Sequence, residues 1–321
     1  MNRLRSGGAG LAAFLLMLNA FSWGVSWWPL RHLQSHGLHP LWATALMYGL
    51  ITAGLLLVRF RAAWGGLRAH PALWLLGLIS GFTNLGFNWA ITVGDVVRVV
   101  LLFYLMPAWS VLAAWLLLGE KPTWGAIARL LLAMAGVVIV LKTPDVQWPV
   151  PQDLADWLAL TSGLAFAINN ALLRRYSYTP VPARMLAMFG GSAAMAFLAA
   201  LLAMQWGAGL GLPAVPGFAL APAGIPVLLV LTACFALGNM ALQYAAARLA
   251  AASMALVMLT EIVFASASSA LLGAGDITPR TLVGGGLIVL AAVLAALTSG
   301  GGDGSSGGNS RGSKGKAIPP A

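Results

Sequence analysis

A single carboxylate lies in the middle of an otherwise uncharged apolar stretch. Residues 250–272 (AAASMALVMLTEIVFASASSALL) carry no charged side chain except Glu261. A charged group at the centre of a bilayer is costly, so in a membrane span it marks a functional site. Glu261 is a candidate to bind the ammonium group of an amino acid or another cation, and also to carry a proton. The structural alternative is a protonated glutamic acid that hydrogen-bonds to a neighbouring helix.

Polar and aromatic side chains recur at helical spacing in other apolar segments. Asn19, Trp23 and Trp27 are four residues apart, which places them on one face of a helix. Carboxamides that face lipid are left without partners, so such stripes must face protein or water. The candidate substrate-binding residues are Asn19, Trp23, Trp27, Asn84, Asn88, Tyr104, Asn169, Gln243, Tyr244 and Glu261. The alternatives are hydrogen bonds between helices for the carboxamides and an aromatic belt at the membrane surface for Trp27.

Pro107 lies near the middle of the apolar segment 97–118. Proline has no backbone N–H, so it kinks a helix and frees the carbonyl about four residues earlier. We expect this kink to act as a gating element, with a static bend as the alternative.

The composition is that of an integral membrane protein. Hydrophobic types make up 60% of the 321 residues and charged types only 8%, whereas a soluble domain has about 25% charged residues. The formal net charge of +10 would suggest nucleic acid for a soluble protein. Here the basic residues cluster between apolar segments, where they set the topology. We therefore expect a lipid bilayer and a small molecule as partners, and no nucleic acid.

Ten apolar segments alternate with mostly short connections. A membrane span needs about 20 apolar residues, and the predicted spans are 11–30, 40–58, 71–92, 97–118, 124–141, 154–173, 183–205, 224–246, 250–272 and 280–298. With the N-terminus in the cytoplasm, thirteen Lys and Arg residues fall on the inner side and four on the outer side, as the positive-inside rule requires. The predicted fold class is all-α, with ten transmembrane helices and both termini cytoplasmic.

The chain repeats itself in its two halves. Residues 116–119 match 270–273 at an offset of 154, and residues 23–26 align with 166–169 at an offset of 143. Each copy has an odd number of spans, so the copies cross the membrane in opposite senses, which places a substrate site near the midplane between them. In this alignment Glu261 occupies the position of Pro107. The predicted units are two five-helix repeats and a disordered cytoplasmic tail, at 1–148, 149–298 and 299–321.

Several short motifs in the first half follow one another in a family-specific order. They are Trp23-Gly24, Met106-Pro107, Leu118-Gly119-Glu120-Lys121-Pro122-Thr123 and Ala135-Gly136. With these motifs the ten spans resemble the EamA-type transporters of the drug/metabolite transporter superfamily. The second half departs from the pattern, because no Glu follows Gly273. The resemblance implies a secondary transporter, and the Trp-rich first span favours the branch that exports aromatic and other neutral amino acids.

The sequence thus predicts a secondary active transporter that exports small metabolites such as amino acids by alternating access across the cell inner membrane. Spans 1, 3, 4, 6, 8 and 9 are expected to line the cavity, and the energy comes from a proton gradient or from the substrate's own gradient. The alternative transport function is a nucleotide-sugar or phosphorylated-sugar antiporter. It is disfavoured because phosphates bind to Lys or Arg, and no such residue lies at the predicted midplane.

A polytopic membrane scaffold or enzyme is the alternative from a different class. Before the tail at 299–321 the chain has no Gly-x-Ser-x-Gly motif, it has no His-Glu-x-x-His or Cys-x-x-Cys motif anywhere, and Glu261 is its only mid-span acid. We therefore expect no enzyme activity, no catalytic residue, no cofactor and no metal. The choice between monomer and homodimer is left open.

Overall fold

The computed structural model describes residues 2–93, 96–141, 151, 153–206, 215–272 and 278–299. Within these residues all regular secondary structure is helical, with no strand. The helices are α1 (Asn2–Val25), α2 (Trp27–Ser35), α3 (Pro40–Ala69), α4 (Ala72–Val93), α5 (Val96–Phe103), α6 (Met106–Leu118), α7 (Trp124–Leu141), α8 (Leu154–Arg175), α9 (Val181–Trp206), α10 (Gly224–Ala246), α11 (Ala251–Met258), α12 (Thr260–Leu271) and α13 (Pro279–Ser299).

These helices reproduce the ten predicted segments. Seven segments are single helices, and the other three are each made of two helices: α1 with α2, α5 with α6, and α11 with α12. Four stretches are long and apolar enough to cross a membrane by themselves: Gly8–Ser35, Pro40–Ala69, Val181–Trp206 and Gly224–Ala246. The described part of the chain is therefore an all-helical membrane-type fold. Of the predicted tail, residues 300–321 lie outside the described residues.

Large apolar side chains cover the outside of the helices. Leu57 and Trp124 are each 87% exposed, a surface that suits lipid and not water. The interior contains many alanines and glycines, which let helices approach closely where lipid supplies no hydrophobic driving force between them. At one such contact, a Cβ at Gly77 of α4 would lie 2.7 Å from the carbonyl oxygen of Ala187 in α9.

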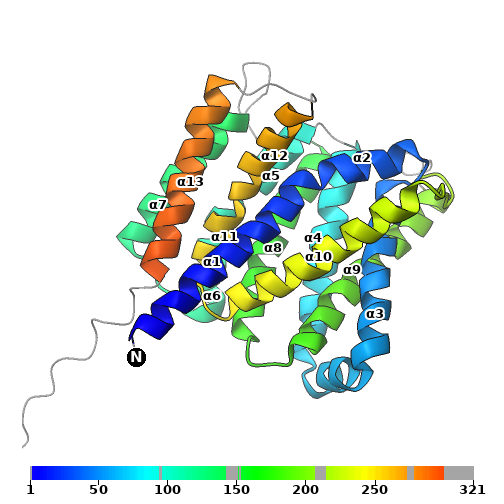
Figure 1. Ribbon diagram of the computed structural model, residues 1–321, viewed down its shortest axis with the longest axis horizontal. Coiled ribbons are helices and arrows are strands. Elements are labelled where there is room, and N and C mark those ends of the chain that lie inside the picture. Colours follow the sequence, from blue (N-terminus) through cyan, green and yellow to red (C-terminus); the bar gives the residue numbers. More distant parts are fainter. Residues whose placement is uncertain are drawn as a thin grey trace, which may run out of the picture.

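Helices from the two halves of the sequence pair with each other. The principal contacts between halves join α3 with α9, α7 with α13, and α1 with α10, and α4 packs against both α8 and α9. Figure 1 shows α7 and α13 side by side at one edge of the molecule. A Cβ at Gly136 of α7 would lie 2.6 Å from the carbonyl oxygen of Gly284 in α13, and the reverse distance is the same. Two inverted copies of one unit would produce such pairs, and the inverted repeat itself remains a prediction.

The span that contains Pro107 is broken instead of smoothly kinked. Helix α5 ends at Phe103, and α6 begins at Met106 with Pro107 in its first turn. A first-turn proline costs a helix no hydrogen bond, because the N–H groups there have no helical acceptor. The Phe103 carbonyl oxygen lies close to Gly163 of α8, where a Cβ would be only 2.6 Å away.

Candidate functional site

A cavity lies between the two halves of the chain. Its described lining residues come from ten helices: α1, α3, α4, α5, α6, α8, α9, α10, α11 and α12, the last of which contributes Glu261. All six spans expected at the cavity contribute to it, and α3 and α9 do so as well. The aromatic lining residues are Trp23, Tyr48, Phe87, Phe103, Phe166, Phe189 and Phe235. The uncharged polar ones are Asn19, Ser80, Thr83, Asn84, Asn169, Ser192 and Asn239. Among the described lining residues, Glu261 is the one that carries a charge.

Glu261 reaches the cavity from the first turn of α12. Its backbone carbonyl packs against α1, where a Cβ at Gly24 would lie only 2.6 Å from that oxygen. The small residue in the Trp23-Gly24 pair therefore lets α1 pack closely against the backbone of α12 at Glu261. Tyr104, which is buried, interacts with the carboxyl group through its side chain. The hydroxyl of Tyr104 thus supports Glu261 without being a lining residue itself.

Of the three residues predicted on one face of the first span, two line the cavity and one does not. Asn19 and Trp23 line the cavity, and the Trp23 ring packs edge-on against Phe235 with ring centroids 4.4 Å apart. Trp27 lies outside the lining: its indole N–H donates to Ser268 Oγ at 3.0 Å, and Arg31 stacks over its ring. Trp27 begins α2 and contacts α12 at Ser268, which follows Glu261 in that helix.

Asn84 lines the cavity but its hydrogen-bonding groups are engaged by protein. Its Oδ1 accepts from the Tyr48 hydroxyl at 2.8 Å, and its Nδ2 donates to Ser192 Oγ at 3.0 Å. Asn88 lies outside the lining and donates to Thr44 Oγ1 at 2.6 Å. Both asparagines therefore join α4 to neighbouring helices, as the structural alternative expected.

The two candidate residues of span 8, Gln243 and Tyr244, both lie outside the cavity lining. Gln243 is buried and accepts from the Arg184 Nε at 2.9 Å. Its own Nε2 donates at 2.6 Å to Oδ1 of Asn239, which does line the cavity. Tyr244 points elsewhere, with the Arg248 guanidinium 3.5 Å from its ring centroid.

Sequence reasoning missed the role of Arg184. It counted this residue among the inner basic residues, but the side chain is 2% exposed and also donates through one terminal nitrogen to three backbone carbonyls of residues 176, 177 and 179. Tyr48, Phe189 and Ser192 were missed as well, because they come from spans that were not expected at the cavity. No local sequence pattern distinguishes these residues from ordinary packing residues.

Adjacent asparagines in α8 have different surroundings. Asn169 lines the cavity, and its Oδ1 is buried without a hydrogen-bond partner among the described residues. Asn170 is not a lining residue, is fully buried, and both polar atoms of its amide lack a partner in the described part of the chain. Asn169 is therefore the member of the pair that has access to a ligand in the cavity.

The Leu118–Thr123 motif builds a turn and an ion pair at the end of α6. Gly119 has a φ of +70°, a left-handed backbone that terminates the helix, and the Glu120 N–H closes the turn onto the Ala114 carbonyl at 3.2 Å. The Glu120 carboxylate accepts from Arg174 Nε at 2.7 Å. Thr123 Oγ1 accepts from the backbone N–H of Ala126 in the first turn of α7.

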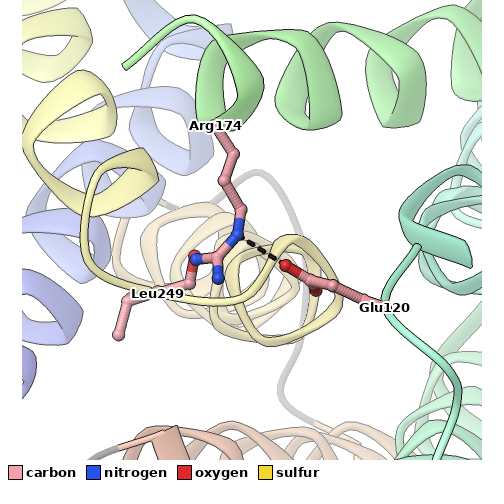
Figure 2. A network of polar contacts seen from close by, with 3 residues as sticks. All are labelled: Glu120, Arg174 and Leu249. Carbon is pink, nitrogen blue, oxygen red and sulfur yellow. Dashed lines mark hydrogen bonds and ion pairs between the residues drawn. The ribbon is translucent and has the colours of Figure 1, made fainter. Parts of the chain in front are cut away.

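Figure 2 shows how Arg174 links three segments: its guanidinium pairs with Glu120 and also donates to the carbonyl of Leu249. Arg174 is at the end of α8, and Leu249 precedes α11. The neighbouring Arg175 donates to the Leu117 carbonyl at 3.0 Å. These contacts close one end of the bundle between α6, α8 and α11.

The apolar exterior, the paired helices and the internal polar cavity define a polytopic helical membrane protein. The sequence model of the EamA-like transporter family matches residues 10–142, and this match confirms the resemblance to the drug/metabolite transporter superfamily. No curated protein matches the chain. One solved structure, described only as "Crystal structure of protein", is similar with a TM-score of 0.73 and 16% identity, over 90% of this chain and 97% of that one. At this identity the likeness concerns the fold alone. The family consists of membrane transporters of small molecules.

Proposed function

We propose that this protein is a secondary transporter that exports small organic molecules, amino acids among them, across the cell inner membrane by alternating access. The substrate occupies the cavity between the two halves, and Glu261 binds its ammonium group or exchanges that group for a proton. The protein is a transporter and not an enzyme or a scaffold. The direction of transport and the membrane rest on the family resemblance, and the amino acid class rests on the cavity wall as well.

The observation that carries this proposal is the composition of the cavity wall. One carboxylate, Glu261, stands among aromatic rings that include Trp23 and Phe235. A carboxylate attracts a cationic group by charge, and aromatic faces attract cations and pack against apolar bodies. A molecule with an ammonium group and an apolar or aromatic side chain satisfies both features of the wall.

Phosphorylated substrates fit this wall less well. Their oxygens need Lys or Arg, and the described lining residues include neither. The buried Arg184 does not line the cavity, and it donates through Nε to Gln243 and through one terminal nitrogen to backbone carbonyls. This distribution of charge favours amino-acid-like substrates over the nucleotide-sugar and phosphorylated-sugar alternatives.

The test is uptake and counterflow in proteoliposomes with a panel of amino acids, amines, nucleobases and a phosphorylated sugar, with and without a pH gradient. We expect counterflow of ammonium-bearing substrates and a loss of at least about tenfold in the Glu261→Gln variant, because charge-assisted hydrogen bonds contribute about 1.5–3 kcal/mol. If protons are exchanged at Glu261, the same variant loses its response to the pH gradient while it retains counterflow of any substrate that it still binds.

The matched control is Glu120→Gln, which makes the same chemical change in an acid that lies outside the cavity lining. Its effect is expected to be several-fold smaller and equal for all substrates. Transport at the wild-type rate and pH response in Glu261→Gln would refute the role of this carboxylate. Counterflow of the phosphorylated sugar alone would favour the antiporter alternative.

A further inference from the structure

Two carboxamides in the cavity wall donate hydrogen bonds to methionine sulfurs. Asn19 Nδ2 lies 3.3 Å from Met258 Sδ, and Asn239 Nδ2 lies 3.6 Å from Met188 Sδ. All four residues line the cavity. A thioether is a weak acceptor, whereas buried amide donors in proteins normally meet an oxygen. Both donors therefore retain most of their capacity to bind an oxygen atom of a ligand.

The two carboxamides lie at the same contact between α1 and α10, although they come from opposite halves of the chain. The Asn19 side chain packs against Gly238, the residue next to Asn239, so closely that a Cβ at Gly238 would overlap with Asn19 Oδ1. Helix α1 packs along α10 at this contact. The asparagines are only 3% and 8% exposed, so water competes little for their donors.

The orientation of the Asn239 amide is fixed by a buried chain of hydrogen bonds. A guanidinium can only donate hydrogen bonds, so Gln243 must turn its Oε1 toward Arg184. The distance from Arg184 Nε to Gln243 Oε1 is 2.9 Å. Gln243 Nε2 then donates to Asn239 Oδ1 at 2.6 Å. As a result, the Asn239 NH₂ group is the part of that amide left to face Met188 and the cavity. Arg184 does not line the cavity, but through Gln243 it fixes the Asn239 amide so that its NH₂ group, a hydrogen-bond donor, faces the cavity.

We propose that the Asn19 and Asn239 NH₂ groups form a subsite for a carbonyl or carboxylate oxygen of the transported molecule. Met258 and Met188 cover the two donors when the subsite is empty. Met258 ends α11 and Glu261 lies in the first turn of α12, so the two residues flank the same bend, and both line the cavity. The oxygen subsite and the carboxylate therefore belong to one cavity wall. This subsite rests on the proposed function, and it defines a ligand with an ammonium group and an oxygen acceptor a few atoms apart.

Equilibrium binding to the full-length protein in lipid nanodiscs tests the subsite separately from transport. The probes are phenylalanine, phenylalaninamide and phenethylamine, which share an ammonium group and an aromatic ring but carry a carboxylate, a carbonyl and no oxygen. We expect at least one of the two oxygen-bearing probes to bind about tenfold or more tightly than phenethylamine, the effect of one to two hydrogen bonds. The comparison of phenylalanine with phenylalaninamide tells which kind of oxygen the subsite prefers.

The decisive variant is Gln243→Glu. Its carboxylate still accepts from Arg184 but has no N–H for Asn239, so the Asn239 amide turns its NH₂ group toward residue 243 and its oxygen toward the cavity. We expect the preference for the oxygen-bearing probe to fall to about twofold, while phenethylamine affinity is retained or improved. The control Gln34→Glu makes the same change at an exposed residue and keeps the wild-type preference.

A second variant guards against a folding defect in Gln243→Glu. Met188→Leu removes the sulfur that competes for Asn239 Nδ2, and it should leave the preference for the oxygen-bearing probe equal to or greater than that of the wild type. Equal binding of all three probes to the wild type, no binding of any of them, or an unchanged preference in Gln243→Glu would overturn the subsite. The expected preference without counterflow in proteoliposomes would instead overturn the transporter proposal and leave the subsite standing.

Discussion

Two spans of the molecule bend at corresponding places by different chemistry. In the first half α6 begins at Met106, and in the second half α12 begins at Thr260, which is the offset of 154 found between the two halves of the sequence. Pro107 breaks the first span because it has no N–H. The second span has no proline: the Thr260 hydroxyl bonds to the Val257 carbonyl at 2.8 Å, and the Leu259 N–H is shared between the carbonyls of Ala255 and Leu256.

At both bends a backbone carbonyl packs against a glycine of a neighbouring helix. The Phe103 carbonyl lies against Gly163 of α8, and the Glu261 carbonyl lies against Gly24 of α1. What differs is the side chain presented just after the break: an inert ring at Pro107, and a carboxylate in the cavity at Glu261. The first bend is set by covalent structure, whereas the second is set by hydrogen bonds next to an ionisable group. We therefore expect the second bend to be the one that responds to substrate or protons.

The largest effect on transport is expected when Glu261 of the second bent span is replaced by proline, the residue at the corresponding position of the first. Glu261 is the second residue of α12, as Pro107 is of α6, and proline is tolerated in the first turn of a helix. Glu261→Pro should therefore fold and keep its bend, yet lose about 10- to 100-fold in counterflow of ammonium-bearing substrates through loss of the charged group. Initial rates in proteoliposomes measure this. A variant as active as the wild type would mean that the bend, and not the carboxylate, matters.

The glycines behind the two bends should be equally intolerant of a methyl group. In Gly24→Ala the new Cβ meets the Glu261 carbonyl oxygen at 2.6 Å, and in Gly163→Ala it meets the Phe103 carbonyl oxygen at the same distance. Overpacking of this kind costs about 1–3 kcal/mol, so both variants should unfold at a lower temperature in detergent. Gly54→Ala, where no atom lies within 4 Å of the new Cβ, is the control. A loss confined to one of the two glycines would break the parallel between the bends.

Restoring the missing N–H of the first bend should have a moderate effect. Pro107→Ala allows a hydrogen bond to the Phe103 carbonyl and so favours a continuous helix by about 1 kcal/mol. If the bend is needed for the transport cycle, turnover falls about fivefold while thermal stability is maintained or rises. Pro279→Ala, at the exposed start of α13, is the matched control and should turn over as the wild type does. An unchanged rate in Pro107→Ala would identify a static bend.

The smallest effect is expected at the loop that follows the first bent span. Glu120→Gln removes the ion pair with Arg174, whose two side chains are about 30% exposed, and partly exposed pairs contribute up to about 1 kcal/mol. We expect a change of about two- to fivefold in transport rate at low ionic strength and a smaller one at high salt, because salt screens the pair. The sequence after α12 has Ala274 and Gly275 where the first half has Glu120. Identical rates at both salt concentrations would show that the ion pair does not affect the cycle.

The sequence by itself determined the membrane class, the ten helical segments and the residue around which the cavity is arranged. Composition and span length fix these features, because a bilayer permits few alternatives to apolar helices. The position of Glu261 in the cavity follows the same logic, since an acid in the middle of an apolar span must face protein or water. The break at Pro107 was also visible, because a missing N–H is a local property of one residue.

Only the tertiary structure decided which of the other polar residues reach the cavity. Trp27 contacts Ser268 of α12 outside the cavity lining, and Asn88 donates to Thr44 on a neighbouring helix. Helical spacing gives the face of a residue within one helix, whereas the partner of that face depends on how the helices pack. The orientation of Asn239 is the clearest case: it depends on Arg184, 55 positions earlier in the chain, and on the rule that a buried guanidinium must find acceptors.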